Sequence, residues 1–244
     1  WSASTVISAP FIREGTVERS KVNEILLEGD RFIRSFGYVM PPFAYWSPEE
    51  MKRRVSDDSS LIKQSRLGWD ITDYGQGKFD ELGLFLFTVR NGSVDDLKAG
   101  KGMLYAEKIM ISRENQISPM HTHALKAEDI INRGGGKLVI ELFSSTPDGQ
   151  IDREAPVEVL TDGTMRKLKA GDKLSLSPGE SVTLLPGQWH AFWGEGGDVL
   201  IGEVSTVNDD LTDNIFAEPV GRFSTIVEDT DPVHLLVADY DHFL

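Results

Sequence analysis

Apolar residues in the N-terminal quarter of the chain recur at helical spacing. Between residues 22 and 36 they fall on one face of a helix, and Gly37 provides a natural stop. The pattern predicts a second helix over residues 48–54, because Ser47 is a favourable N-cap and Pro48 suits the first helical position. Two glutamates follow in the first turn of that helix. The N-terminal quarter is therefore predicted to be helical.

From residue 68 onward the pattern changes to short apolar runs separated by Gly, Asn, Asp and Pro, which is typical of β-strands. The runs cover residues 82–90, 103–111, 137–143, 157–160, 181–185 and 199–204. The segments between them adopt positive φ at low cost, as hairpin turns require: Asn91-Gly92, Asp148-Gly149, Asp162-Gly163 and Ala170-Gly171-Asp172. Many short strands at this spacing indicate a sandwich or barrel rather than a parallel sheet with crossover helices.

The chain contains no internal repeat and no low-complexity linker, so a second domain has no obvious boundary. We expect an N-terminal arm over residues 1–20 and a helical segment over 21–66 that packs on the barrel. The barrel and its C-terminal tail are expected to span 67–244 as one structural unit. Such barrels commonly form oligomers, and the arm can exchange between subunits, so we expect a homodimer.

Charge and composition narrow the classes of partner. The formal charge of −14 argues against binding to nucleic acid or to an anionic membrane, because both need clustered Lys and Arg. The 244 residues include no cysteine, which excludes disulfides, thiolate metal ligands and thiol nucleophiles. No apolar stretch approaches the roughly 18 residues needed to span a bilayer. We expect a cytoplasmic protein in which any metal is held by nitrogen and oxygen ligands.

Two short motifs concentrate the histidines of the chain. His121 and His123 stand two residues apart, so on a strand both point to the same face and can reach one ion. Glu128 follows five residues later, and the Pro186-Gly187 turn delivers His190 at the start of a later strand. A lone histidine in a half-buried strand is more often a hydrogen-bonded core residue than a ligand. Here three of the five histidines lie in these motifs, which predicts one divalent metal ion bound by the three histidines and Glu128.

Such imidazole and carboxylate ligands, without sulfur, suit Mn²⁺, Fe²⁺, Co²⁺, Ni²⁺ or Zn²⁺. The remaining His234 and His242 lie in the C-terminal tail, where a surface position is expected. The two motifs resemble those of cupins, which are double-stranded β-helix barrels: His-x-His-x₄-Glu-x₆-Gly (His121, His123, Glu128, Gly135) and Pro-Gly-x-x-His (Pro186, Gly187, His190). Asn115 and Gly194 depart from the cupin pattern, but they affect turns and not ligands. The resemblance implies a mainly β cupin barrel with N-terminal helices.

A narrower resemblance covers most of the chain. Four segments resemble bacterial D-lyxose isomerases: Leu67-Gly68-Trp69-Asp70, Tyr105 to Met110, Glu128 to Gly136, and Gly202 to Ser205 with Val207 to Asp210. This resemblance implies a Mn²⁺-dependent enzyme that interconverts D-lyxose and D-xylulose and often acts on D-mannose and D-fructose. Other divalent metals such as Co²⁺ suit the same ligands.

An aldose-ketose isomerase moves a proton or a hydride between C1 and C2, and both routes want a metal that polarises the two oxygens. Four protein ligands leave two positions of an octahedron open for them. Glu203 is our first choice for the general base, because an acid in the apolar strand 199–204 needs a partner or a catalytic role if it faces the core. The alternative is an outward-facing residue on an edge strand.

Lys126 is the second catalytic candidate, and its position in the sequence permits either an outward or an inward orientation. It lies five and three residues from His121 and His123, so strict strand alternation places it on the opposite face. The matching position in the resembling family supports a catalytic role instead. If Lys126 points inward, burial and the neighbouring cation are expected to lower its pKa.

Four residues are candidates for sugar binding. Residues 208–214 are rich in short polar side chains, which most often mark a capped turn. They follow the Glu203 strand, so Asp213 or Arg222 can reach sugar hydroxyls from a barrel mouth. One of Phe192 and Trp193 should face inward and can pack on a sugar, although core packing is the commoner role. Two rival functions stay open, an Fe²⁺-dependent cupin dioxygenase and a non-catalytic sugar-binding cupin.

Overall fold

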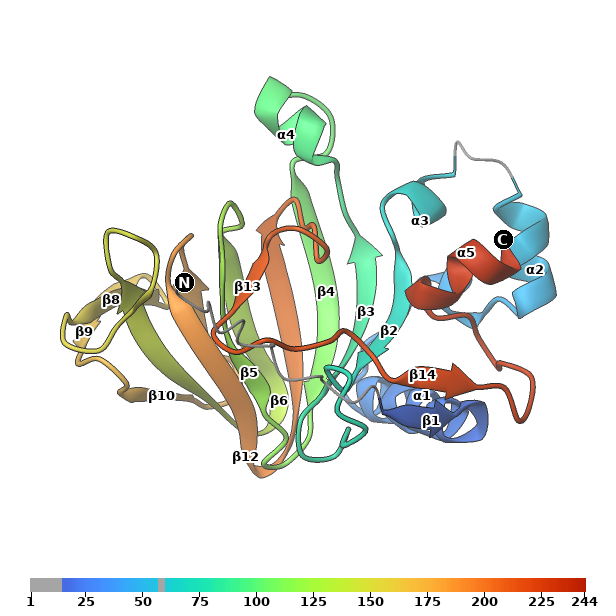
Figure 1. Cartoon of the computed structure of the whole chain (residues 1–244), viewed down its shortest axis with the longest axis horizontal. Helices are drawn as coiled ribbons and strands as arrows, with labels where there is room; N and C mark the ends of the chain where they lie inside the picture. The colour runs from blue at the N-terminus through green and yellow to red at the C-terminus, as the bar shows by residue number, and fades with distance from the viewer. Residues whose placement is uncertain (1–14, 57–59) are drawn as a thin grey trace, which may run out of the picture.

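The computed structural model describes residues 15–56 and 60–244, which form a strongly curved β-sheet with helices beside it (Figure 1). Residues 1–14 of the predicted arm lie outside the described residues. The end of the arm forms β1 (Thr16–Glu18), which pairs in parallel with β14 (Thr225–Val227). The described part of the arm therefore contacts the C-terminal tail of its own chain.

The main sheet has 12 strands, and its principal order is β2-β3-β4-β12-β6-β11-β8-β9 with antiparallel neighbours. Of the other four strands, β5 pairs with β12 and β13, and β7 and β10 pair with β6. The bounds are β2 (Gly68–Thr72), β3 (Leu84–Arg90), β4 (Tyr105–Ser112), β5 (Ser118–His123), β6 (Glu128–Ser145), β7 (Ile151–Asp152), β8 (Val157–Thr161), β9 (Thr164–Leu168), β10 (Lys173–Leu176), β11 (Ser181–Leu184), β12 (Trp189–Thr206) and β13 (Asn214–Phe216).

Two strands are longer than the apolar runs that predict them. β6 and β12 each span 18 residues and continue through glycines that the sequence pattern favours as turns. Gly135 (φ 94°) and Gly197 (φ 134°) lie at the bend, where the β6–β12 register also shifts. These left-handed conformations suit glycine, so each strand can bend sharply and pair on both sides of the bend. The bend brings His190 and Glu203, which lie at opposite ends of β12, into one cavity.

The predicted hairpin at Asn91-Gly92 is wrong. The connection from β3 to β4 instead contains α4 (Val94–Ala99), and Ser93 caps this helix by accepting a hydrogen bond from the Asp96 N–H. The Asn91 side chain bonds the backbone of Asn208 at 2.8 and 2.9 Å, so a long-range contact determines its conformation. The turns at Asp148-Gly149 and Asp162-Gly163 do join adjacent antiparallel strands.

The remaining helices flank the sheet. The second predicted helix is confirmed as α2 (Pro48–Arg54), where the Ser47 hydroxyl accepts a hydrogen bond from the Glu50 N–H. The others are α1 (Arg19–Ser35), α3 (Leu61–Gln64), α5 (Tyr240–Phe243), η1 (Pro42–Tyr45) and η2 (Val237–Asp239). Across residues 15–56 and 60–244, no helix is both long enough and apolar enough to cross a membrane.

The two faces of strands β2, β3 and β4 pack into different cores because their side chains alternate. Outward-facing Trp69, Phe87 and Ile109 pack with α1, whose apolar face is Val22, Ile25, Leu26 and Ile33. Inward-facing Leu86 and Met110 join the barrel core with residues of β6, β8, β10, β11 and β12. Helix α1 thus covers the outside of the sheet, and the barrel interior is left to hold a site.

Candidate metal centre and active site

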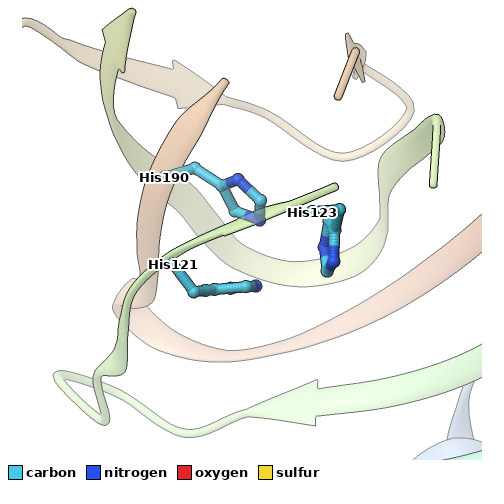
Figure 2. A group of neighbouring side chains, drawn as sticks. All are labelled: His121, His123 and His190. Atoms are coloured by element: carbon cyan, nitrogen blue, oxygen red, sulfur yellow. The ribbon is translucent and has the colours of Figure 1, made fainter. Parts of the chain in front are cut away.

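Three histidines converge inside the barrel. His121 and His123 lie on β5 and His190 on β12, with His190 directly opposite His121 in the β5–β12 register. Their ligand nitrogens lie within 4.8 Å of one another, and all three side chains are buried (Figure 2). Antiparallel pairing brings residues far apart in sequence within reach of one ion, as the spacing within each motif predicts.

Glu128, the first residue of β6, completes the group. Its Oε1 lies 3.2 Å from His123 Nε2 and 3.3 Å from His190 Nε2. All three atoms are buried without a hydrogen-bond partner among the described residues. A buried polar atom left unpaired costs about 1–3 kcal/mol, so a site with several such atoms calls for a shared cation. The nitrogen and oxygen donors fit a divalent metal ion.

Hydrogen bonds orient two of the imidazole rings. His121 Nδ1 lies 2.8 Å from the Pro119 carbonyl, and His190 Nδ1 lies 3.1 Å from the Gln188 carbonyl. A carbonyl only accepts, so each Nδ1 carries the proton and each Nε2 presents a lone pair. The backbone therefore sets the tautomer that a metal ion needs.

The protonation states also suit a metal ion. Burial and the neighbouring His190 and His123 hold the pKa of His121 well below its usual range, and burial and Lys126 lower the pKa of His123. Burial opposes ionisation of Glu128, but Lys126 and His123 outweigh it and keep the pKa of this carboxyl well below its usual range. At neutral pH the site therefore offers the neutral imidazoles of His121 and His123 and the Glu128 carboxylate.

Lys126 points into the site, so the strand-alternation argument is wrong for this residue. Its Nζ lies 2.7 Å from Glu128 Oε2 and 3.1 Å from Glu203 Oε1. β5 ends at His123 and β6 begins at Glu128, so residues 124–127 form an irregular loop without strict alternation. Burial lowers the pKa of Lys126, but Glu128, Glu203 and Asp210 outweigh it and raise the pKa above its usual value. The protein groups around Lys126 thus shift its pKa in the direction opposite to the predicted lowering, and in these surroundings it is an ammonium ion.

Glu203 is buried and faces the cavity, so it is not an outward-facing residue of an edge strand. Its neighbour in the β4–β12 register is Lys108, whose Nζ lies 3.8 Å from Glu203 Oε1 and 3.1 Å from Asp210 Oδ1. Burial opposes ionisation of Asp210, but Lys108 and Lys126 lower its pKa below the usual range. Lys108 and Asp210 are absent from the predicted site. Lys108, like Glu203, is a charged residue inside a largely apolar strand, and this signal in the sequence could have identified it.

Two predicted sugar contacts lie outside the cavity lining. Asp213 is buried, and its carboxylate accepts hydrogen bonds from the N–H groups of Leu125 (2.7 Å) and Lys126 (2.9 Å). It holds the loop that carries Lys126. The Trp193 ring lies 5.1 Å from Lys173 Nζ, on the face of β12 opposite Phe192. The side chain that alternation turns outward cannot reach a sugar inside the barrel.

The other two predicted sugar contacts, Phe192 and Arg222, line a cavity of about 690 Å³ together with the histidine cluster, Lys126 and Glu203. Its walls also include the apolar residues Leu84, Leu86, Met110, Ile130 and Phe216. Apolar walls with a few convergent polar groups are typical of a small-molecule site. His234 lies outside this lining, whereas the exposed His242 lies at its edge.

The fold and the site together define a cupin barrel with a histidine cluster that could bind a metal ion. Solved structures of L-ribose isomerases share this fold. The enzyme from Cellulomonas parahominis has a TM-score of 0.57 at 15% identity, and that from Acinetobacter sp. DL28 has 0.56 at 13%. Each alignment covers 88% of this chain and 100% of the other. The predicted cupin fold is confirmed.

Sequence comparison identifies the family. The family model for D-lyxose isomerase matches residues 17–240. A D-lyxose/D-mannose isomerase of Serratia proteamaculans is 47% identical over 92% of this chain and 98% of its own. One from Escherichia coli O157:H7 is 43% identical over 93% of this chain and 100% of its own. The chain belongs to the D-lyxose isomerase family and is an aldose-ketose isomerase, which sets aside the two rival functions.

Proposed function

We propose that this enzyme interconverts D-lyxose and D-xylulose, and also D-mannose and D-fructose, with Mn²⁺ held by His121, His123, Glu128 and His190. The relatives named D-lyxose/D-mannose isomerase support the substrates. The observation that carries the proposal is one cavity that contains both the unpaired ligand atoms and the Glu203 carboxylate. Co²⁺ suits the same donors.

His121, His123, Glu128 and His190 would hold the divalent metal ion, which when bound would supply polarisation of the oxygens on C1 and C2 of the open-chain sugar. Glu203 is placed to act as the general base that takes the proton from C2 of the aldose and returns it to C1. Lys126, which bonds Glu203 at 3.1 Å, is placed to donate a hydrogen bond to the sugar oxygen that gains negative charge. Lys108 contacts the same carboxylate oxygen of Glu203 and holds its orientation.

The cavity walls supply the remaining sugar contacts. Phe192 offers an apolar ring to the carbon-hydrogen face of the sugar, and the Arg222 guanidinium can donate to hydroxyl groups. Asp213 and Trp193 do not line the cavity, so the proposed sugar contacts do not include them.

We further propose a homodimer in the cytoplasm. Leu125, Leu211 and Ile215 expose 60%, 55% and 46% of their surface on two segments joined by the hydrogen bond from Ala124 N–H to the Asp213 carbonyl. Several exposed apolar side chains on neighbouring segments are typical of an interface. A cysteine-free chain is compatible with the reducing cytoplasm. Sedimentation velocity measures the oligomeric state directly, and a monomer at micromolar concentration would contradict the dimer.

The Glu203→Gln variant tests the proposed function. The variant keeps the shape of the side chain and its contact with Lys126 but removes the base, so metal content is expected to stay normal while kcat falls by at least about 100-fold. Glu141→Gln on β6 is the matched control, because Glu141 is half-buried and does not line the cavity. The assay follows D-lyxose and D-xylulose by NMR in D₂O after loading with Mn²⁺. Near-normal turnover in Glu203→Gln would remove Glu203 as the base, and deuterium at C1 or C2 of the product reports the proton-transfer route.

A further inference from the structure

Asp70 is an acidic residue of the cavity that the proposed mechanism does not use. It lies on β2 opposite Leu86 of β3, and Leu86 lies opposite Met110 of β4. Residues in register on neighbouring strands point to the same face of a sheet. Leu86 and Met110 line the cavity, and Asp70 does as well. Its carboxylate therefore faces the same space as Glu203, from β2 at the end of the strand order, with β3 and β4 between it and β12.

The carboxylate of Asp70 has spare capacity to accept hydrogen bonds. Its Oδ1 accepts a bond from the Ile71 N–H at 3.0 Å. Its Oδ2 lies 3.6 Å from Arg222 Nη2, beyond the roughly 2.7–2.9 Å of a close charge-assisted hydrogen bond. Asp70 is 17% exposed and Arg222 is 48% exposed. The pair is loose and open to the cavity, unlike an ion pair that closes on itself.

Three other polar side chains of the cavity lining, Tyr74, Asp210 and Thr72, already have protein partners. The Tyr74 hydroxyl bonds the Ser118 hydroxyl at 2.9 Å, and Asp210 is held by Lys108. The Thr72 hydroxyl donates to the Arg222 carbonyl, which ties the segment carrying Arg222 to the end of β2. That segment runs between β13 and β14 along the barrel (Figure 1). Arg222 is thus held beside Asp70 by its backbone, and its side chain stays available.

We propose that Asp70, together with Arg222, is a specificity-determining residue that binds the sugar hydroxyls remote from C1 and C2. A hydroxyl both donates and accepts, so a carboxylate beside a guanidinium can satisfy it in both directions. Glu203, Lys126 and the proposed metal ligands act on the first two carbons of the sugar. The cavity walls between Glu203 and Asp70 include the apolar residues Leu86 and Met110. This inference rests on the proposed function and extends it to the distal end of the same substrate.

The electrostatics of Asp70 support a ligand-binding role. Burial raises its pKa to about 6, and Arg222 only partly offsets this effect. Keeping an ionised carboxylate at such a position costs stability unless something compensates it. A sugar hydroxyl that donates to the carboxylate is a compensating group that the protein itself does not supply.

The test is a thermodynamic double-mutant cycle in which the charge of the Asp70 carboxylate and one sugar hydroxyl are removed separately and then together. Asp70→Asn and wild-type Mn²⁺-loaded enzymes are assayed on D-lyxose and on its 4-deoxy and 5-deoxy analogues. A hydrogen bond to a charged group is worth about 1.5–3 kcal/mol, so the variant is expected to raise KM for D-lyxose by about 10-fold to 100-fold with little change in kcat. For one deoxy analogue, the wild-type enzyme should show the same rise in KM that Asp70→Asn causes with D-lyxose. With that analogue, Asp70→Asn should raise KM almost no further. Asp129→Asn on β6, outside the cavity lining, is the matched control.

Several outcomes decide the inference. Losses that add for both analogues, or an effect confined to kcat, would overturn it, because a merely structural role predicts no coupling to a particular hydroxyl. Arg222→Gln changes a half-exposed side chain and should show the same coupling, which gives a second, independent variant for the test. Calorimetric binding of D-arabinitol, the reduced form of D-lyxose, gives the same cycle without turnover. A wild-type enzyme that binds the polyol but converts no sugar would refute the proposed function alone. A wild-type enzyme that neither binds the polyol nor converts a sugar would refute both the proposed function and the role of Asp70.

Discussion

The ionisation of Asp70 should make folding depend on pH in a direction that a single variant can isolate. Burial raises the pKa of this carboxyl from 3.8 to about 6 in the folded protein, with Arg222 lowering it and Asp210 raising it further. The folded state therefore binds the proton more tightly than the unfolded state. The contribution that proton binding to Asp70 makes to folding stability is fully present below about pH 4 and is lost as pH rises through about 6.

The magnitude follows from the two pKa values. Each tenfold change in proton affinity is worth about 1.4 kcal/mol, so the change from 3.8 to about 6 corresponds to about 3 kcal/mol. Asp70→Asn keeps an oxygen that accepts the bond from the Ile71 N–H and removes the ionisation. The variant should be about 3 kcal/mol more stable than wild type at pH 7.5, and this advantage should shrink toward zero near pH 4.

The assay is guanidinium unfolding of the metal-free proteins, with a chelator present, at several pH values between 4 and 7.5. The difference between the variant and wild type removes contributions common to both, including those of the other carboxyls. Asp231→Asn is the control, because Asp231 is exposed and its backbone carbonyl, not its side chain, accepts the bond from Asn23. A difference between Asp70→Asn and wild type that does not vary with pH would refute the reasoning.

Three other substitutions test the metal site, the loop and the bend. His190→Ala should lose both bound metal and activity, measured by elemental analysis and turnover; full metal content with normal rates would contradict the ligand assignment. Asp213→Ala leaves the N–H groups of Leu125 and Lys126 without their acceptor, so we expect about 2–4 kcal/mol lower unfolding free energy and a reduced kcat. An unchanged unfolding free energy and an unchanged kcat would show that Asp213 does not hold the loop that carries Lys126. Gly135→Ala places a Cβ against the Asp198 carbonyl at φ 94°, so we expect little folded protein; a thermal midpoint like that of wild type would refute the strain argument.

The sequence alone determined the features that depend on short-range spacing. Ser47 and Pro48 define the start of α2 through local capping, which acts within one helical turn. The two-residue spacing of His121 and His123 places both on one face of β5, because side chains alternate along a strand. The Pro186-Gly187 turn delivers His190 to the start of β12, as predicted. These predictions need no knowledge of what packs against each segment.

The tertiary structure decided where alternation stops and which charges meet. Lys126 faces the site because the chain leaves the strand after His123, and the distant Asp213 fixes the loop that follows. Lys108 and Glu203 are 95 positions apart in the numbering, yet the β4–β12 register places them side by side. Local spacing cannot predict such partners, because strand order and bends arise from packing of the whole sheet. The physical reason is that long-range pairing sets the surroundings of each charged side chain, and these surroundings decide its ionisation and its task.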